Sequence, residues 1–158
     1  MTDHLNLIRV KLQHLSRMSE YLAYSLTQVG SVLTLKDWAA LTPDQHESLD
    51  AFRVRFSEFQ EHLGKAMRSI AIEEEQEVER FGSVLAFMVR LKLIDSADHW
   101  KLIRELRNAV NHEYEDDAPR LAEFFELMTK EVPALIDVFN RLQTHCASAY
   151  GISQQPAT

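Results

Sequence analysis

The most chemically suggestive stretch of this sequence runs from Trp100 to Tyr114. On a helix, its apolar residues cover one arc: Leu102, Ile103, Leu106, Ala109 and Val110. The opposite arc carries two fixed cations, two amides and an imidazole: Arg104, Arg107, Asn108, Asn111 and His112. Arg can bind phosphate through two parallel hydrogen bonds, and His can move a proton near neutral pH. This arc therefore predicts a site for chemistry on a phosphate group.

Charge is distributed unevenly along the chain. The sequence has 17 Lys and Arg against 24 Asp and Glu, a formal charge of -7, which argues against a surface that grips nucleic acid everywhere. Between residues 87 and 111 the balance reverses, because five basic residues stand against three acidic ones. The basic ones are Arg90, Lys92, Lys101, Arg104 and Arg107. A phosphate site should therefore be a local basic island in this stretch.

The spacing of Arg107 and His112 sets a geometric condition. Residues five apart on an ideal helix diverge by roughly 140°. One straight helix therefore cannot bring both side chains onto one small group. Either the helix ends before His112, or a second copy of the chain completes the site across a two-fold dimer.

The sequence lacks the motifs of several other functional sites. A carboxylate-bridged metal pair needs Glu-x-x-His on one helix face, and none of the seven histidines has an acidic residue three positions earlier. His-Glu-x-x-His and the phosphate-binding Gly-x-x-x-x-Gly-Lys-Ser/Thr do not occur. Gly82-Ser83 lies in a helical pattern and lacks the Asp-x-Asp that a nucleotidyltransferase needs after it. Cys146 and His145 do not form a catalytic pair, because adjacent helical residues diverge by about 100°. Cys146 is interpreted as a small packing residue.

The segment Arg107-Asn-Ala-Val-Asn-His112-Glu-Tyr114 resembles the Arg-x4-His-x-Tyr signature of HEPN domains, and more narrowly the HepT-like proteins paired with minimal nucleotidyltransferases. Arg9 to His14 has the same Arg–His spacing, but no Tyr follows two residues later. Arg55 to His62, with six residues between, also lacks that Tyr. Asn108 directly after Arg107 strengthens the match at Arg107–His112. The flanks 91–95 and 132–135 also look like the family's, and the resemblance is strongest from about residue 90 to residue 142.

The resemblance implies an antiparallel helical bundle that dimerises so that two motif copies share a cleft. In the ribonuclease members, the Arg positions the scissile phosphate and the His acts as acid and base while the 2'-hydroxyl attacks, without metal or cofactor. Carried over, these roles fall to Arg107 and His112, and Asn108 would help to orient or bind the substrate. Asn111 is a further candidate contact. Arg104 is either a second phosphate contact or a solvated side chain.

The resemblance also implies a partner. In some HepT-like systems a nucleotidyltransferase antitoxin attaches AMP to the Tyr of the motif, which corresponds to Tyr114. The added negative charge and bulk would repel and block RNA. The chain is thus predicted to be a toxin of a toxin–antitoxin pair, a homodimeric endoribonuclease with RNA as substrate.

Acidic residues next to the motif keep two alternatives open. Glu113, Glu115, Asp116 and Asp117 would weaken RNA attraction unless they point away, and they would attract a basic surface on the antitoxin. The chain would then be a non-catalytic HEPN partner that presents a substrate to a nucleotidyltransferase. The plainest alternative is a surface Arg and a helix-terminal His favoured by the helix dipole.

The elements that position these residues are predicted to be helices. Apolar residues at three- and four-residue steps predict a first helix ending near Gly30 and a second after Thr42, which can cap it with Gln45. A turn is expected around Trp38. The aromatic stripe of the second helix, Phe52, Phe56 and Phe59, should be core or dimer interface.

Three more helices are expected toward the carboxyl end. The acidic run 73–79 is interpreted as a solvated helix start, with apolar residues from Val78 to Met88 carrying the third helix. A fourth begins near Ala97, capped by Asp95-Ser96. Asp117 should cap the last, where Pro133 predicts a kink or a restart.

The whole chain suits one all-α domain of about five helices. Four Gly and four Pro in 158 residues are too few for a turn-rich β fold. Residues 1–147 are expected to form the HEPN-like domain and residues 148–158 a frayed tail. One Cys, no apolar run of membrane-spanning length and no signal-like start predict a cytoplasmic protein.

Overall fold

The computed structural model describes residues 2–113 and 117–153, and for residues 111–113 it describes the helical backbone alone. Across these residues the chain forms five α-helices and one short 3-10 turn, with no strand. The elements are α1 (Asp3–Leu33), η1 (Trp38–Ala40), α2 (Pro43–Glu73), α3 (Phe81–Arg90), α4 (Ala97–Glu113) and α5 (Ala118–Tyr150). The all-α architecture with five helices is as expected from the sequence.

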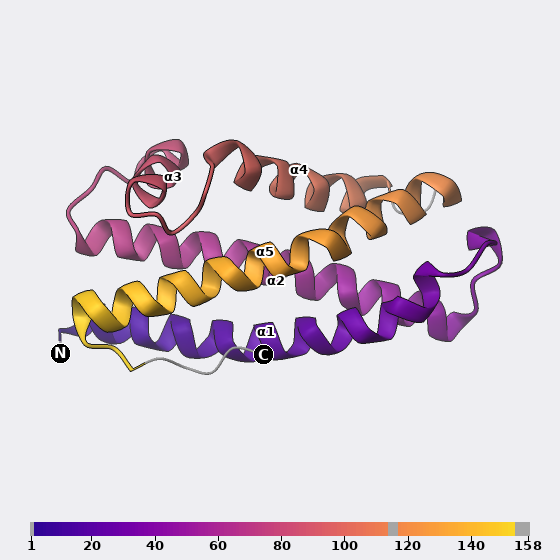
Figure 1. Cartoon of the computed structure of the whole chain (residues 1–158), viewed down its shortest axis with the longest axis horizontal. Coiled ribbons are helices and arrows are strands. Elements are labelled where there is room, and N and C mark those ends of the chain that lie inside the picture. The colour runs from indigo at the N-terminus through magenta and orange to yellow at the C-terminus, as the bar shows by residue number, and fades with distance from the viewer. Residues whose placement is uncertain (1, 114–116, 154–158) are drawn as a thin grey trace.

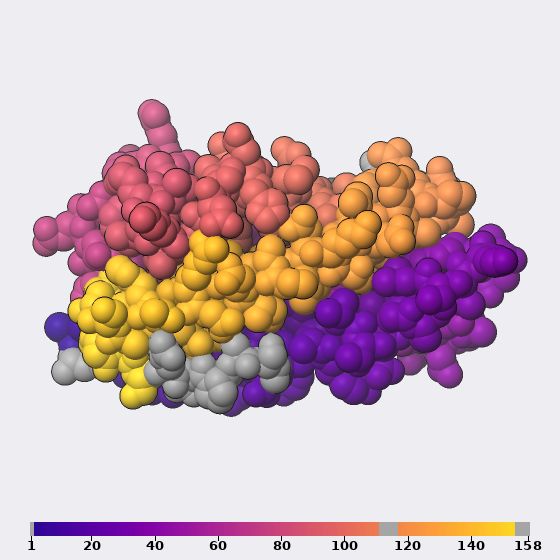
Figure 2. All heavy atoms as spheres, viewed as in Figure 1, coloured from indigo at the N-terminus to yellow at the C-terminus, as the bar shows by residue number. Residues whose placement is uncertain are grey.

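Three long helices run along the molecule, and two shorter ones lie along one side. α1 and α2 form an antiparallel hairpin, and α5 packs against both of them (Figure 1). α3 and α4 lie beside α2, where α4 runs antiparallel to it (Figure 1). In the face shown in Figure 2, α5 separates the α3–α4 side from α1. No helix within the described residues is both long enough and apolar enough to cross a membrane.

Side chains at the helix starts explain where the elements begin. The hydroxyl of Thr42 accepts a hydrogen bond from the Gln45 backbone N–H, and the Gln45 side chain accepts one from the Thr42 N–H. This capping box satisfies two backbone donors that the helix itself cannot pair. The Asp117 side chain caps α5 in a similar way, by accepting from the Arg120 N–H. Both caps were expected from the sequence, as was the turn at Trp38.

The core is a single apolar cluster whose largest members are aromatic. Phe52, Phe56 and Phe59 of α2 are completely buried inside this one chain. Phe125 and Phe139 of α5 meet them, with ring centroids 6.2 Å apart for Phe52–Phe125 and 6.0 Å apart for Phe59–Phe139. Of the two expected roles for the aromatic stripe, the structure shows core packing.

The acidic run 73–79 ends a helix rather than starting one, contrary to the expectation above. α2 ends at Glu73, and α3 begins only at Phe81. Glu75 takes a left-handed conformation with φ 58°, and the Gln76 N–H bonds back to the Ala71 carbonyl at 2.9 Å. This is the usual helix-ending motif, for which Gly is the common residue. The end of α2 could not be predicted from the sequence, because Glu75 rather than Gly occupies the left-handed position.

The last helix is longer than expected. It continues without interruption through Pro133 and past residue 148 to Tyr150, so no restart occurs. Gly151 then ends it in a left-handed conformation with φ 69°, and Ile152 returns to the core with 2% of its surface exposed. The chain is therefore helical as far as Tyr150 and anchored in the core by Ile152, whereas the sequence predicted a frayed tail from residue 148. The first helix also extends beyond Gly30, to Leu33.

Candidate functional site

The predicted site residues lie on α4, which is fastened to the bundle by its apolar face. Trp100, Ile103 and Val110 of this helix are buried. Leu102 was expected on the same arc, but 57% of its surface is exposed. It lies about 100° around the helix from Ile103, beyond the edge of the buried stripe.

Arg107 is held in place by neutral oxygen atoms. Its Nη1 donates to Oε1 of Gln60 at 2.8 Å, and its Nη2 and Nε donate to Oδ1 of Asn108 at 3.1 and 3.4 Å. Gln60 belongs to α2 and is only 2% exposed, so it is a fixed partner. No carboxylate among the described residues pairs with Arg107. The guanidinium is thus oriented while its charge stays uncompensated and two of its five N–H donors remain for another acceptor.

A cavity of about 350 Å³ opens beside Arg107 between α2, α3 and α4. Among the described residues, four basic side chains line it, Lys65, Arg68, Arg104 and Arg107, with Glu61 as the single acidic one. Lys65 and Glu61 form an exposed pair at 3.6 Å. We name this space the basic cavity.

Helical spacing places these residues on facing ridges. On α4, Trp100, Arg104 and Arg107 follow one another at steps of four and three, which align them on one face. On α2, Glu61, Lys65 and Arg68 follow the same steps. The two helices are antiparallel (Figure 1). Because Gln60 meets Arg107, the two rows of residues face each other along the cavity.

Phe81, the first residue of α3, forms one wall of the basic cavity. Its ring lies close to Gly64, where an added Cβ would stand only 3.3 Å from the ring atom Cζ. Arg68 contacts the same Phe81 ring: its guanidinium carbon lies 5.6 Å from the ring centroid, a cation–π distance. The absence of a side chain at Gly64 therefore allows α3 to lie close to α2. In this position the Phe81 ring orients the Arg68 guanidinium.

The sequence-predicted residues fall into two groups. The structure brings Arg104 and Arg107 together at the basic cavity and places Asn108 as a hydrogen-bond acceptor for Arg107. Asn111 and His112 belong to α4, but their side chains lie outside the described structure, as do Tyr114, Glu115 and Asp116 entirely. The helix itself continues to Glu113, so His112 is helical in its backbone.

Three residues of the site were missed in the sequence: Gln60, Lys65 and Arg68. They lie some 40 residues before the motif, on the flank of a helix whose apolar stripe faces the core. A basic pair at i and i+3 was visible there. The sequence did not show which helix this flank would face.

Other polar clusters in the described residues bind helices to one another. Glu74 accepts a hydrogen bond from the Tyr150 hydroxyl at 2.9 Å and lies 3.1 Å from Nε2 of His145. Burial and this carboxylate raise the pKa of Tyr150. Burial also raises the pKa of Cys146 to about 12, so its thiol stays protonated at neutral pH, in keeping with a packing residue.

No group of three or more His, Cys, Asp or Glu side chains in the described parts of the chain is arranged to hold a metal ion. Comparisons of this chain with protein-family models, with curated proteins and with solved structures found no match.

Proposed function

We propose that this chain is a HEPN toxin that cleaves RNA without a metal ion, as a two-fold dimer. The observation that carries the proposal is Arg107: an oriented guanidinium, without a carboxylate partner among the described residues, at the edge of a basic cavity in an acidic protein. Neutral partners hold the group in position while its charge remains for a phosphate.

The continuity of α4 supports the dimer. Since the helix runs on to Glu113, positions 107 and 112 keep the separation of roughly 140° that an ideal helix imposes. Of the two geometries left open by the sequence, this favours the one in which a second chain completes the site. Exposed Leu102 adds an apolar side chain to the same helix, as a dimer contact would require.

The proposed reaction is an internal transesterification. The 2'-hydroxyl oxygen of one nucleotide attacks the adjoining phosphorus, and the bond to the 5'-oxygen of the next nucleotide breaks. The products are a 2',3'-cyclic phosphate and a 5'-hydroxyl. Arg107 stabilises the charge that develops on the phosphoryl oxygens, and His112 takes the proton from the attacking hydroxyl or returns one to the leaving oxygen.

The proposed partner is a nucleotidyltransferase antitoxin that transfers AMP to Tyr114. The intact mass of the chain co-expressed with its partner tests this, because each AMP adds a discrete increment. Tyr114→Phe should abolish that increment. An increment that persists in the Phe variant would place the modification elsewhere.

Cleavage of RNA in the presence of EDTA tests the function itself. Arg107→Ala and His112→Ala are each expected to lower the cleavage rate at least about 100-fold, the usual range for an acid–base group or a charge-stabilising donor. Arg9 and His14 on α1 offer a matched control, because they have the same spacing and His14 is exposed. Alanine at these two positions should leave cleavage unchanged. Equal rates in the motif variants and the wild type would refute the assignment.

The non-catalytic alternative has a distinct outcome. The run of acidic residues 113–117 favours attraction to a basic partner over attraction to RNA. Tight co-purification with a nucleotidyltransferase, with no RNA cleavage by the freed chain, would support that alternative.

A further inference from the structure

The basic cavity holds more positive charge than Arg107 alone would require. Arg68 and Arg104 are half-buried, and neither forms an ion pair with a carboxylate of the described residues. Like charges gathered in one concave space repel one another, so the arrangement costs free energy in the empty protein. The chain has seven more acidic than basic side chains, yet of its described acidic residues only Glu61 lines this cavity. The geometry therefore favours an anionic occupant.

The cavity extends along α4 in one direction from Arg107. Arg104 lies one turn away and Trp100 one turn further, a distance of roughly 10 Å at 1.5 Å per residue. This direction leads toward the start of α4 and away from position 112. A nucleic acid strand rises about 3.4 Å per nucleotide when stacked, so this length can hold a second phosphate beside the one at Arg107.

We propose that Lys65, Arg68 and Arg104 form a second phosphate position, which binds the backbone phosphate of an RNA nucleotide neighbouring the one held by Arg107. For its ligand this proposal rests on the proposed function. The two Arg side chains come from facing helices, so one phosphate between them accepts hydrogen bonds from both sides. Arg68 is oriented by Phe81, and Lys65 adds charge at the cavity edge.

The test measures binding without cleavage. The probe is a single-stranded RNA oligonucleotide with 2'-O-methyl riboses, which has no 2'-hydroxyl to attack. Fluorescence anisotropy gives the Kd for the full chain at several salt concentrations. Arg68→Gln and Arg104→Gln are each expected to weaken binding about tenfold and to reduce the slope of log Kd against log salt by about 0.7, the value for one lost single-strand phosphate contact.

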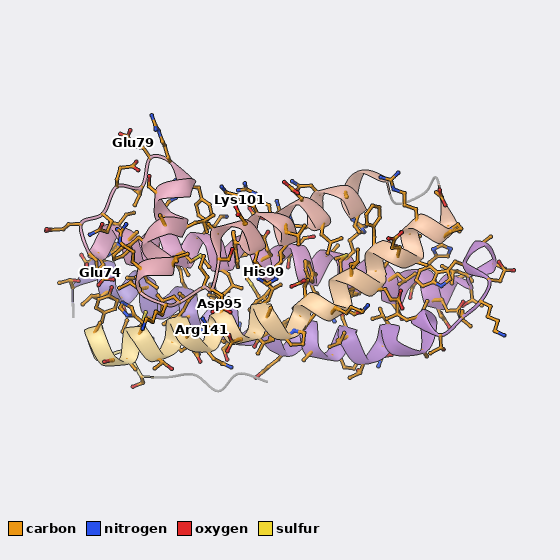
Figure 3. The ribbon with its side chains drawn as sticks, turned by 45° about the horizontal axis from the view of Figure 1, so that its top comes forward. Glu74, Glu79, Asp95, His99, Lys101 and Arg141 are labelled. Atoms are coloured by element: carbon orange, nitrogen blue, oxygen red, sulfur yellow. The ribbon has the colours of Figure 1, made fainter. Side chains whose placement is uncertain are left out.

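Lys101 provides the matched control. It lies on the same helix as Arg104, but it points away from the bundle and does not line the cavity (Figure 3). Lys101→Gln removes the same charge and should change the Kd by less than about twofold. If it weakens binding as much as Arg104→Gln, the attraction is diffuse and the second phosphate position is wrong. Arg68→Lys keeps the charge and should retain the slope of log Kd against log salt. A retained slope in this variant would show that the loss in Arg68→Gln comes from the missing charge.

A competition arm identifies the source of the phosphate. AMP is expected to displace the oligonucleotide only at concentrations far above the Kd of the oligonucleotide, because it offers a single phosphate. Displacement at equal concentrations would overturn the RNA proposal in favour of a free nucleotide.

A cleavage arm separates this proposal from the proposed function. With unmodified RNA, the Arg68 and Arg104 variants should raise KM and retain kcat. An unchanged KM, while the Arg107 and His112 variants are inactive, would overturn the second phosphate position alone. If the Arg107 and His112 variants cleave normally, the function fails, and the oligonucleotide Kd values still decide the second position.

Discussion

At the scale of single residues, the site depends on how Arg107 is held. Three of its donors are used by amide oxygens of Gln60 and Asn108, which carry no charge. A carboxylate in either place would also fix the guanidinium, but it would neutralise it. Neutral acceptors give orientation and leave the full positive charge for a phosphate.

The first prediction replaces Gln60 by Glu. The new carboxylate would stand where the amide oxygen lies 2.8 Å from Nη1, so it would form a buried ion pair with Arg107. RNA affinity should fall about tenfold or more, since a hydrogen-bonded charge contact is worth about 1.5–3 kcal/mol. Anisotropy titration with the 2'-O-methyl oligonucleotide measures this loss.

Glu61→Gln is the opposite change at the neighbouring position. It removes the one carboxylate that lines the basic cavity in the part of the chain that the structure describes. The side chain is exposed, so folding should be unaffected. RNA affinity should rise. A loss of affinity in this variant, or an unchanged affinity in Gln60→Glu, would contradict the role given to Arg107.

At the scale of elements, the start of α4 is tied to α5 by polar contacts. Nη1 of Arg141 on α5 donates to the Asp95 carboxylate at 2.8 Å (Figure 3). Nε2 of His99 lies 2.8 Å from the Glu131 carboxylate. The hydroxyl of Ser96 accepts from the His99 N–H and caps the helix, while Asp95, expected to share the cap, reaches across to Arg141 instead. These contacts set the position of α4 and therefore of Arg104 and Arg107, which line the basic cavity.

The second prediction concerns the pH dependence of the Asp95–Arg141 contact. The hydrogen bond and the charge of Arg141 lower the pKa of Asp95 below its ordinary value near 3.8. A lowered pKa in the folded state stabilises the fold above the unfolded pKa, and that stabilisation is lost as the pH falls through the folded pKa. Asp95→Asn should therefore be slightly less stable than the wild type at pH 7.

Thermal unfolding at pH 7 and near pH 2 checks this sign. The difference in Tm between Asp95→Asn and the wild type should be small, because the pair is exposed, and it should shrink in acid. A difference that stays the same at both pH values would show that the carboxylate charge plays no part.

At the scale of the whole molecule, the proposed site needs two chains. Arg107 and position 112 lie on one continuous helix, whose geometry separates them. In a two-fold dimer, Arg107 of one chain can work with His112 of the other, and each dimer then has two equivalent composite sites.

The third prediction is complementation between inactive chains. Arg107→Ala and His112→Ala chains are unfolded, mixed in equal amounts and refolded together. Half of the dimers should then pair one chain of each kind, and each mixed dimer has one intact composite site. RNA cleavage should return to about a quarter of the wild-type value. No recovery, in dimers shown by mass to be mixed, would mean that each site lies within one chain.

Local patterns in the sequence were sufficient for most of the elements. The caps at Thr42 and Asp117 and the helices with apolar residues at steps of three and four could be predicted, because each depends on residues within a few positions of one another. The aromatic stripe was predicted only as core or dimer interface, and the structure shows that it is core. The prediction failed at Glu75, where the helix-ending position carries no Gly. It also failed at residue 148, because the stop signal is Gly151.

The tertiary structure alone decided which surfaces meet. Arg104, Arg107 and Asn108 were visible as one helix face in the sequence, but their partners Gln60, Lys65 and Arg68 were not. Periodicity defines the faces of a helix, and it carries no information on which helix lies opposite. That choice is made by the packing of α2, α3 and α4, including the space that Gly64 leaves for Phe81. The sequence thus determined a basic face on one helix of an acidic protein. The packing of α2 and α3 beside that face formed the cavity.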